Sequence, residues 1–254
     1  MTPERDTDVM GGFAKGLSVL EAFGRGRERL TIAEVSRLTG LDRATSRRCL
    51  TTLSRLGYAT HDGRFFSLTV RVLALGHAYL ASTPLPNQIQ PFLDGLAATL
   101  QESCSCSILD GTEIVYIARA MQRRVMSIGL GVGSHLPAYC SSMGRVLLAA
   151  MPNAAVGDVL DRSDIQPLTP RTLTERCELL AEIERVRQQG FAIIDEELEI
   201  GLRSLAVPIT TTAGRVVAAI NTGAQTSRVT LDRLRDDVLP RLLEVQAKLA
   251  RVVV

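Results

Sequence analysis

The sequence predicts an α+β protein made of two domains joined by a helix. The chain has 254 residues, which is long for one compact domain and short for three. Residues 13–68 show a pattern of short capped helices followed by one hairpin. A proline-containing break at residues 83–86 separates them from a longer stretch in which strands and helices alternate.

The composition is that of an ordinary globular protein. Hydrophobic residues make up 46% of the chain and charged residues 22%, which excludes a wholly disordered chain. No uninterrupted apolar run approaches the ~18 residues that a membrane span needs, and the polar start of the chain does not resemble a secretion signal. The five cysteines have no regular spacing, so we expect no disulfide framework. These features predict a cytoplasmic protein without a membrane partner.

The net charge of +2 hides an uneven distribution. Residues 13–71 contain 11 basic and 5 acidic side chains, whereas residues 84–254 contain 17 basic and 19 acidic ones. A compact basic segment joined to a mildly acidic one is typical of a module that binds a polyanion.

Three helices are expected at the start of the first domain. The first covers residues 13–23. The second opens at Thr31 with a capping box, in which Glu34 reaches back to the threonine, and it ends at Gly40. Asp42 caps the third helix.

Gly57 ends the third helix, and residues 58–68 have the pattern of a hairpin. Asp62 and Gly63 stand between β-prone flanks, and a tight hairpin turn needs the positive φ that glycine adopts readily. Helix, helix, short turn, helix and hairpin is the order of a winged helix-turn-helix. The three-residue turn at residues 40–42 suits its two central helices.

Residues 69–82 form a further helical stretch, which Pro84 and Pro86 break. We therefore predict a winged helix-turn-helix domain at residues 13–68, a linker helix at residues 69–83 and a second domain at residues 84–254.

The second domain mixes helices and strands, and residues 172–175 give a second capping pattern. This mixture indicates an antiparallel sheet with packed helices. The expected helices cover residues 88–100, 144–150, 172–189 and 231–251. The expected strands cover residues 105–109, 113–118, 126–128, 192–195, 205–209 and 216–222.

The third helix presents side chains suited to reading DNA. With Leu50 as the buried direction, a helical wheel turns residues 45, 48, 52 and 55 outward. Arginine bonds a guanine edge bidentately, and threonine bonds a base or touches a thymine methyl group. Lys15 and the hairpin tip are placed to touch phosphate. The predicted contacts with double-stranded operator DNA are Arg43, Ala44, Thr45, Arg47, Arg48, Thr52 and Arg64. The alternative is a solvated charged helix face.

No cofactor or metal site is predicted in the second domain. Cys104 and Cys106 face the same side of a strand, but no second cysteine or histidine cluster accompanies them, so we expect two buried thiols. The glycines of residues 129–133 lack the lysine and the strand–helix context of a phosphate loop.

Three further features each have more than one interpretation. Residues 140–142 precede a helix, where they could hold a nucleophile, bind an anion or cap the helix; we favour anion binding. The acidic residues 195–199 form either a solvated turn or a pocket wall. Arg203 precedes an apolar strand, where it either meets a ligand carboxylate through a two-bond fork or pairs with a glutamate at 196, 197 or 199.

An ordered set of motifs resembles the IclR family of bacterial transcriptional regulators over residues 13–251. Besides the winged helix, the motifs are Gly133-Ser-His-Leu-Pro-Ala-Tyr-Cys-Ser-Ser-Met-Gly-Arg-Val-Leu-Leu-Ala149, Gly190-Phe with Asp195-Glu-Glu-Leu-Glu-Ile-Gly-Leu-Arg-Ser-Leu-Ala-Val-Pro208, and Gly214 with Ala218-Ala-Ile-Asn221. The resemblance implies a DNA-binding domain, a linker helix used in dimerisation, and an effector domain similar to GAF and PAS sensors. Family members are commonly dimers or dimers of dimers on partly palindromic operators.

Carried over by these motifs, the effector pocket falls on Ser142, Met143, Gly144, Leu202, Arg203, Ser204, Asn221 and Gly223. Ile194 stands where glyoxylate-responsive members have aspartate, and Arg203 where they have asparagine, which argues against that two-carbon ligand. Residues 137–145 are closer to the subgroup that regulates protocatechuate, 4-hydroxybenzoate and β-ketoadipate catabolism. One arginine, several hydroxyls, an amide and apolar walls fit a hydroxylated aromatic acid or a dicarboxylic acid.

We therefore expect a ligand-responsive transcriptional regulator, a homodimer or dimer of dimers, that binds operator DNA and a small carboxylic acid. One alternative is an enzyme that uses Cys140 or Ser142 and carries a DNA-binding domain. The other is a DNA-binding protein without a ligand.

Overall fold

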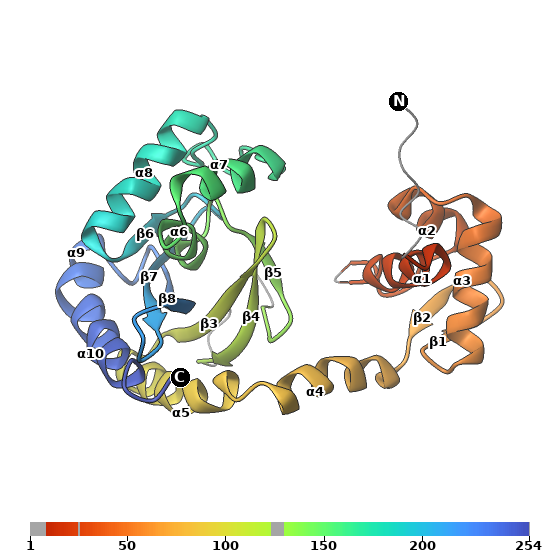
Figure 1. Cartoon of the computed structure of the whole chain (residues 1–254), viewed down its shortest axis with the longest axis horizontal. Helices are drawn as coiled ribbons and strands as arrows, with labels where there is room; N and C mark the ends of the chain where they lie inside the picture. The colour runs from red at the N-terminus through yellow and green to blue at the C-terminus, as the bar shows by residue number, and fades with distance from the viewer. Residues whose placement is uncertain (1–8, 25, 123–129, 254) are drawn as a thin grey trace. The chain divides into compact units, whose positions relative to one another are not determined.

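The computed structural model describes residues 9–24, 26–122 and 130–253. The chain divides into two compact units, with the boundary between Ser82 and Thr83 (Figure 1). The strand predicted at residues 126–128 lies outside the described residues. None of the helices in these ranges is long and apolar enough to cross a membrane.

The first unit begins with three helices whose ends follow from local sequence. They are α1 (Gly11–Glu21), α2 (Ile32–Thr39) and α3 (Arg43–Arg55). Thr31 and Glu34 form both bonds of the capping box, and Gly40 ends α2 with a φ of 69°. The Asp42 side chain accepts the Thr45 amide at the start of α3. The capping predictions for α2 and α3 are confirmed.

A short antiparallel hairpin follows α3. β1 (Ala59–His61) pairs with β2 (Phe66–Leu68), and Gly63 in the turn has a φ of 99°. Phe66 also exchanges backbone hydrogen bonds with Leu30, which ties the hairpin to the segment before α2. Helices and hairpin share one apolar core made of Val19, Ala22, Leu30, Val35, Leu50, Leu53, Ala59 and Phe66. The order of elements confirms the winged helix-turn-helix.

The linker begins with a 3-10 turn, η1 (Val70–Val72), and continues as α4 (Leu73–Ser82). Its apolar side chains Leu75 and Tyr79 are exposed on this chain. α5 (Leu85–Leu100) starts directly after Pro84. The helix break predicted from the prolines is therefore present.

The second unit is built on one antiparallel sheet of six strands in the order β5-β4-β3-β8-β7-β6. The strands are β3 (Ser103–Asp110), β4 (Glu113–Ala120), β5 (His135–Pro137), β6 (Ala192–Asp195), β7 (Leu202–Thr210) and β8 (Val216–Gln225). Five of them correspond to predicted strands, and the three-residue β5 is too short to give an alternating pattern.

Helices cover both faces of this sheet (Figure 1). One face packs on α5 and on the C-terminal helical stretch, with Leu93, Ile220 and Leu242 in the core between them. That stretch comprises α9 (Leu231–Arg233), the π-helical segment η2 (Leu234–Val238) and α10 (Leu239–Leu249). The other face packs on α6 (Ser142–Ala149), α7 (Asn153–Arg162) and α8 (Arg176–Gln189).

Two expectations for these helices need correction. The terminal helix predicted over residues 231–251 is interrupted by the wider turn of η2. The pattern at residues 172–175 does not cap α8, because the helix begins only at Arg176. The Thr172 hydroxyl instead donates to the Glu197 carbonyl at 2.6 Å, and so ties the segment before α8 to the turn after β6. The helix α7 was not predicted at all.

Candidate DNA-contacting surface and candidate ligand cavity

The helix α3, the first turn of α2 and the hairpin enclose one basic groove. Arg43, Arg47 and Arg48 project from α3 as exposed side chains, and Arg64 is exposed at the hairpin tip. A helix that enters the DNA major groove presents such side chains to the bases, while flanking elements contact phosphates. The groove is lined by Thr31, Ile32, Ala33, Arg43, Ala44, Arg47, Arg48, Thr51, Ser54, His61, Gly63, Arg64 and Phe66.

Thr45 does not point outward, so that prediction is wrong. Its side chain is 7% exposed, and its hydroxyl donates to Asp42 Oδ2 at 2.7 Å and accepts from Arg48 Nη2 at 3.1 Å. The helical wheel failed because α3 is covered on two sides. One side packs on α2, and the side that carries Thr45 faces Lys15 and Gly16 of α1. The buried Thr45 hydroxyl therefore accepts a hydrogen bond that helps to orient the exposed Arg48.

The tip of the hairpin is organised by Asp62. Its carboxylate accepts the amides of Phe65 and Arg64 and pairs with the Arg29 side chain. These hydrogen bonds, above all the one from the Phe65 amide, lower the pKa of Asp62 to about 2. The guanidinium groups of Arg29 and Arg64 lie 4.7 and 5.0 Å from the centre of the Phe65 ring. Two cations are thus held beside the groove.

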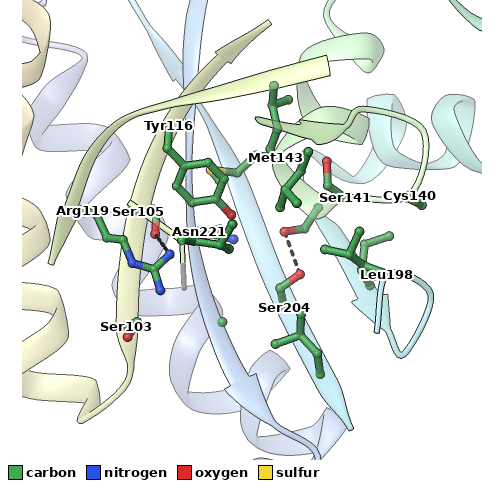
Figure 2. Close-up of a pocket in the computed structure, with 17 residues that line it drawn as sticks. Ser103, Ser105, Tyr116, Arg119, Cys140, Ser141, Met143, Leu198, Ser204 and Asn221 are labelled. Atoms are coloured by element: carbon green, nitrogen blue, oxygen red, sulfur yellow. Dashed lines mark hydrogen bonds between the residues drawn. The ribbon is translucent and has the colours of Figure 1, made fainter. Parts of the chain in front are cut away.

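A cavity lies between the sheet and the start of α6 (Figure 2). Its lining residues are Ser103, Ser105, Ile114, Tyr116, Arg119, Leu130, Leu136, Cys140, Ser141, Ser142, Met143, Ile194, Leu198, Leu202, Ser204, Asn221 and Gly223. The free space between these side chains is about 30 Å³, on the order of one water molecule. A larger ligand must therefore displace some of the lining side chains.

Arg119 brings a positive charge to this cavity, and no described carboxylate forms an ion pair with it. Its Nη1 donates to Ser105 Oγ at 3.3 Å, and its guanidinium carbon lies 5.8 Å from the centre of the Tyr116 ring. The Nε atom is buried and has no hydrogen-bond partner among the described residues. Burial lowers the pKa of Arg119, and the ionisable groups that act on it are Tyr116 and Cys104. In the described part of the chain, its charge is therefore not balanced by an acidic side chain.

A β-bulge turns Arg119 toward the cavity. Cys106 pairs with Ala118, but the next residue of β3, Ser107, pairs with Tyr116, so Ile117 is an extra residue in β4. Ile117 packs in the core below α5, whereas Tyr116 and Arg119 both line the cavity. Strict alternation would have placed those two side chains on opposite faces. The expected strand at residues 113–118 ended before Arg119, and the bulge that turns this side chain into the cavity is set by pairing with β3.

The start of α6 is a capped helix end. The Ser141 side chain accepts the Gly144 amide at 3.2 Å, so capping is the interpretation that holds for this residue. The hydroxyl oxygens of Ser142 and Ser204 lie 2.9 Å apart. Burial raises the pKa of the Cys140 thiol to about 12. The thiol is therefore protonated near neutral pH and is a poor nucleophile.

Six of the eight predicted effector residues line the cavity, namely Ser142, Met143, Leu202, Ser204, Asn221 and Gly223. Gly144 is not among the lining residues. A Cβ atom on it would lie 2.3 Å from the carbonyl oxygen of Ala138. Glycine at this position therefore allows α6 to start in close contact with the preceding segment.

Arg203 does not line the cavity, so the placement of a carboxylate clamp there is wrong. Its Nε donates to Asp195 Oδ1 at 2.5 Å, and its Nη1 donates to the Val229 carbonyl at 2.7 Å. Successive residues of a strand face opposite sides, and Ser204 faces the cavity, so Arg203 is turned away from it. The alternative partner, a glutamate at 196, 197 or 199, was also wrong, because Arg203 pairs across the strands with Asp195.

The turn at residues 195–199 contributes to the cavity wall through Leu198. Its neighbour Glu197 accepts from Arg145 Nη1 and Nη2 at 2.8 and 2.5 Å. Arg145 is 1% exposed and also donates from Nε to the Tyr139 carbonyl. This buried ion pair fastens the turn to α6.

The cysteines Cys104 and Cys106 are buried free thiols, as predicted. Burial raises the pKa of Cys104 to about 11. Within residues 9–24, 26–122 and 130–253, no three His, Cys, Asp or Glu side chains form a group that could hold a metal ion.

Two family models match the chain. The model of the bacterial transcriptional regulator IclR C-terminal domain matches residues 77–251, and the model of the IclR helix-turn-helix domain matches residues 13–63. The Pca regulon regulatory protein of Pseudomonas putida is 49% identical over 239 residues, which make up 94% of this chain and 82% of that protein.

Solved structures agree with these matches. A candidate transcriptional regulator from Rhodococcus sp. RHA1 is 44% identical with a TM-score of 0.81, covering 96% of this chain and 98% of that one. A double mutant of the PobR inducer-binding domain from Acinetobacter, in complex with 3-hydroxybenzoic acid, is 34% identical with a TM-score of 0.64, covering 66% of this chain and 98% of that one. The matched family consists of regulators rather than enzymes, which removes the enzyme alternative. With a winged helix at one end and this cavity-bearing sheet at the other, the chain belongs to the IclR family of DNA-binding transcriptional regulators.

Proposed function

We propose that this protein is a ligand-responsive regulator of an aromatic-acid catabolic operon of the protocatechuate and β-ketoadipate type. In this proposal α3 and the hairpin bind double-stranded operator DNA, and the cavity binds a small carboxylic acid, either aromatic or dicarboxylic. We also propose that the protein acts in the cytoplasm and needs no cofactor.

The composition of the cavity is the observation that carries the proposal. It combines apolar walls with several serine hydroxyls, the Asn221 amide and the Arg119 guanidinium. Apolar walls with a few placed polar groups are typical of sites for small organic molecules, and a guanidinium favours a carboxylate. The names of two relatives support the same ligand class, since one is a Pca regulon regulatory protein and the other was solved with 3-hydroxybenzoic acid.

The small free volume of the cavity supports a link between ligand binding and a change of shape. An aromatic acid is much larger than the present free space, so its binding has to displace lining side chains such as Met143. A ligand changes DNA affinity only if it binds one arrangement of the protein more tightly than another. A cavity that rearranges to admit its ligand supplies two arrangements with different ligand affinity, and regulation further requires that they differ in DNA affinity.

We further propose that the protein acts as a homodimer or a dimer of dimers. The linker helix α4 exposes Leu73, Leu75 and Tyr79, and such apolar surface favours contact with a second copy. A dimer with two-fold symmetry would place two α3 helices on the half-sites of a partly palindromic operator.

The test is a thermal-shift panel of the purified protein with protocatechuate, 4-hydroxybenzoate, β-ketoadipate, benzoate and glyoxylate. A ligand at a hundred times its Kd stabilises the native state by about 2.7 kcal/mol, which raises Tm measurably. We expect an aromatic or dicarboxylic acid to raise Tm and glyoxylate to leave it unchanged. A response to glyoxylate alone would contradict the ligand class. Silence across the panel would favour a DNA-binding protein that has no acid effector.

A further inference from the structure

We propose that the cavity holds its effector at two ends, with Arg119 binding the carboxylate and the hydroxyl pair of Ser142 and Ser204 binding a polar group opposite to it. The ligand class is then narrower: an acid that carries a hydroxyl or a second carboxyl group across a ring, or a chain of similar length, from the first carboxylate. This inference rests on the proposed function and deepens it.

Arg119 has hydrogen-bonding capacity that the described residues leave unused. Its Nε is buried without a partner, and its Nη1 makes only a long bond to Ser105. A guanidinium carries five N–H donors in a fixed fork, and a carboxylate accepts two of them in parallel. Removing such a charge from water is costly, and the lowered pKa of Arg119 reflects this cost. A bound carboxylate would supply both the missing acceptor and the missing negative charge.

Among the described residues, the hydroxyl pair also has one donor without a partner. Ser142 and Ser204 are 1% and 9% exposed, line the cavity, and lie 2.9 Å apart at their hydroxyl oxygens. Each hydroxyl has one hydrogen, and the bond between them uses only one of the two. The pair therefore offers one donor and several lone pairs to a ligand group such as a phenolic hydroxyl.

The order of the strands separates these two ends. The Arg119 guanidinium reaches across to Ser105 on β3, whereas Ser204 stands on β7, with β8 between them. Neighbouring strands lie about 4.8 Å apart, so the two ends are roughly 10 Å apart. A benzene ring with polar groups in para positions, together with a hydrogen bond at each end, spans a comparable length. Figure 2 shows Arg119 and Ser204 on opposite sides of Asn221.

Apolar side chains also line the cavity. Met143 lines it from α6, and Ile194 and Leu198 line it from β6 and the turn after β6, on the far side of β7 from Arg119. These groups suit the face of a ring, and an unbranched methionine changes rotamer easily to make room. A ligand with charge or hydroxyl groups along its whole length would leave them unpaired against these walls.

The test is isothermal titration calorimetry on the purified full-length chain with 4-hydroxybenzoate and benzoate. Arg119→Gln should weaken binding of both acids by roughly 10- to 100-fold, because each loses the same charge-assisted bonds. Ser142→Ala combined with Ser204→Ala should weaken 4-hydroxybenzoate by roughly 10-fold and leave benzoate unchanged. Arg203→Gln, which changes an arginine outside the cavity, is the matched control and should leave both affinities unchanged.

Each result decides a separate statement. If Arg119→Gln binds both acids as tightly as the wild type, Arg119 does not bind the carboxylate. If the double serine variant loses affinity equally for both acids, the two serines do not bind the hydroxyl group. Circular dichroism checks that each variant is folded. If the double variant does not fold, Ser142→Thr takes its place; this variant keeps the hydroxyl and is expected to retain the preference for 4-hydroxybenzoate. If the wild-type chain binds none of protocatechuate, 4-hydroxybenzoate, benzoate and β-ketoadipate, the proposed function fails as well. If it binds them and all variants behave like wild type, only the two-ended arrangement is wrong.

Discussion

At the scale of single residues, the face of the strand on which an arginine lies determines which groups its side chain can contact. Arg203 and Ser204 are neighbours on β7, and only the serine faces the cavity. Arg119 faces the cavity because one extra residue in β4 reverses the alternation. Two arginines on strands of the same sheet therefore differ: Arg203 pairs with Asp195, whereas the Nε of Arg119 has no partner among the described residues.

Arg48 donates a hydrogen bond to the Thr45 hydroxyl, and this bond leads to a prediction about DNA recognition. If Arg48 reads a base, Arg48→Ala should cost about 1–3 kcal/mol of discrimination between a specific and a random duplex. Thr45→Val removes the hydroxyl that orients Arg48 and should cost part of the same discrimination, while Thr45→Ser should retain it. Fluorescence anisotropy with a duplex selected from a random pool by the wild-type protein measures these differences.

A second duplex of scrambled sequence is the control for this experiment. If Arg48→Ala weakens both duplexes equally, Arg48 is a phosphate contact and Thr45 has no part in specificity. A loss in Thr45→Ser as large as in Thr45→Val would show that packing, not the hydroxyl, matters at this position.

At the scale of elements, one buried ion pair joins α6 to the turn after β6. Arg145 lies in the second turn of α6, and Glu197 stands beside Leu198, which forms part of the cavity wall. The Thr172 hydroxyl adds a bond from the segment before α8 to the Glu197 carbonyl. Three segments far apart in the sequence thus meet at one point, and this keeps that wall of the cavity in place.

Removing one member of this pair should destabilise the second unit. Glu197→Leu leaves the Arg145 charge buried, with Glu182 at 3.7 Å as its remaining acidic neighbour among the described residues. The change should cost about 3 kcal/mol of unfolding free energy. Arg145→Met combined with Glu197→Leu removes both charges and should be more stable than the single variant. Urea denaturation of the four proteins in this double-mutant cycle gives the values. A loss in the double variant equal to the sum of the losses in the two single variants would show that the two charges are not coupled.

At the scale of the whole molecule, regulation requires that ligand and DNA affect each other's binding. The proposed ligand cavity and the basic groove belong to different compact units of the chain. Any influence of one on the other is a coupling free energy, and thermodynamics makes it reciprocal. The sign of the coupling states whether the acid strengthens or weakens DNA binding.

Reciprocity itself can be measured. If 4-hydroxybenzoate is the effector, saturating amounts should change the affinity for the selected duplex by roughly 5- to 150-fold, and the duplex should change the affinity for the acid by the same factor. Anisotropy with and without acid gives the first factor, and calorimetry with and without duplex gives the second. Binding of both partners with no change in either affinity would contradict a ligand-responsive regulator.

The sequence by itself determined the local features of this protein. The capped ends of α2 and α3, the turn at Gly63 and the break at Pro84 were all predicted correctly, because each depends on residues a few positions away. The general position of the cavity also followed from motifs, since six of the residues that they indicated line it.

Only the tertiary structure decided which side chains face the two sites. Thr45 is buried because α1 packs beside it, Arg203 turns to Asp195, and Arg119 turns into the cavity at a bulge. A one-residue change of register reverses every later side chain of a strand, and such a change is set by pairing with distant strands rather than by neighbours in the sequence. Contacts between segments far apart in the chain therefore determine which arginine side chain faces the cavity, and we propose that this arginine binds the ligand.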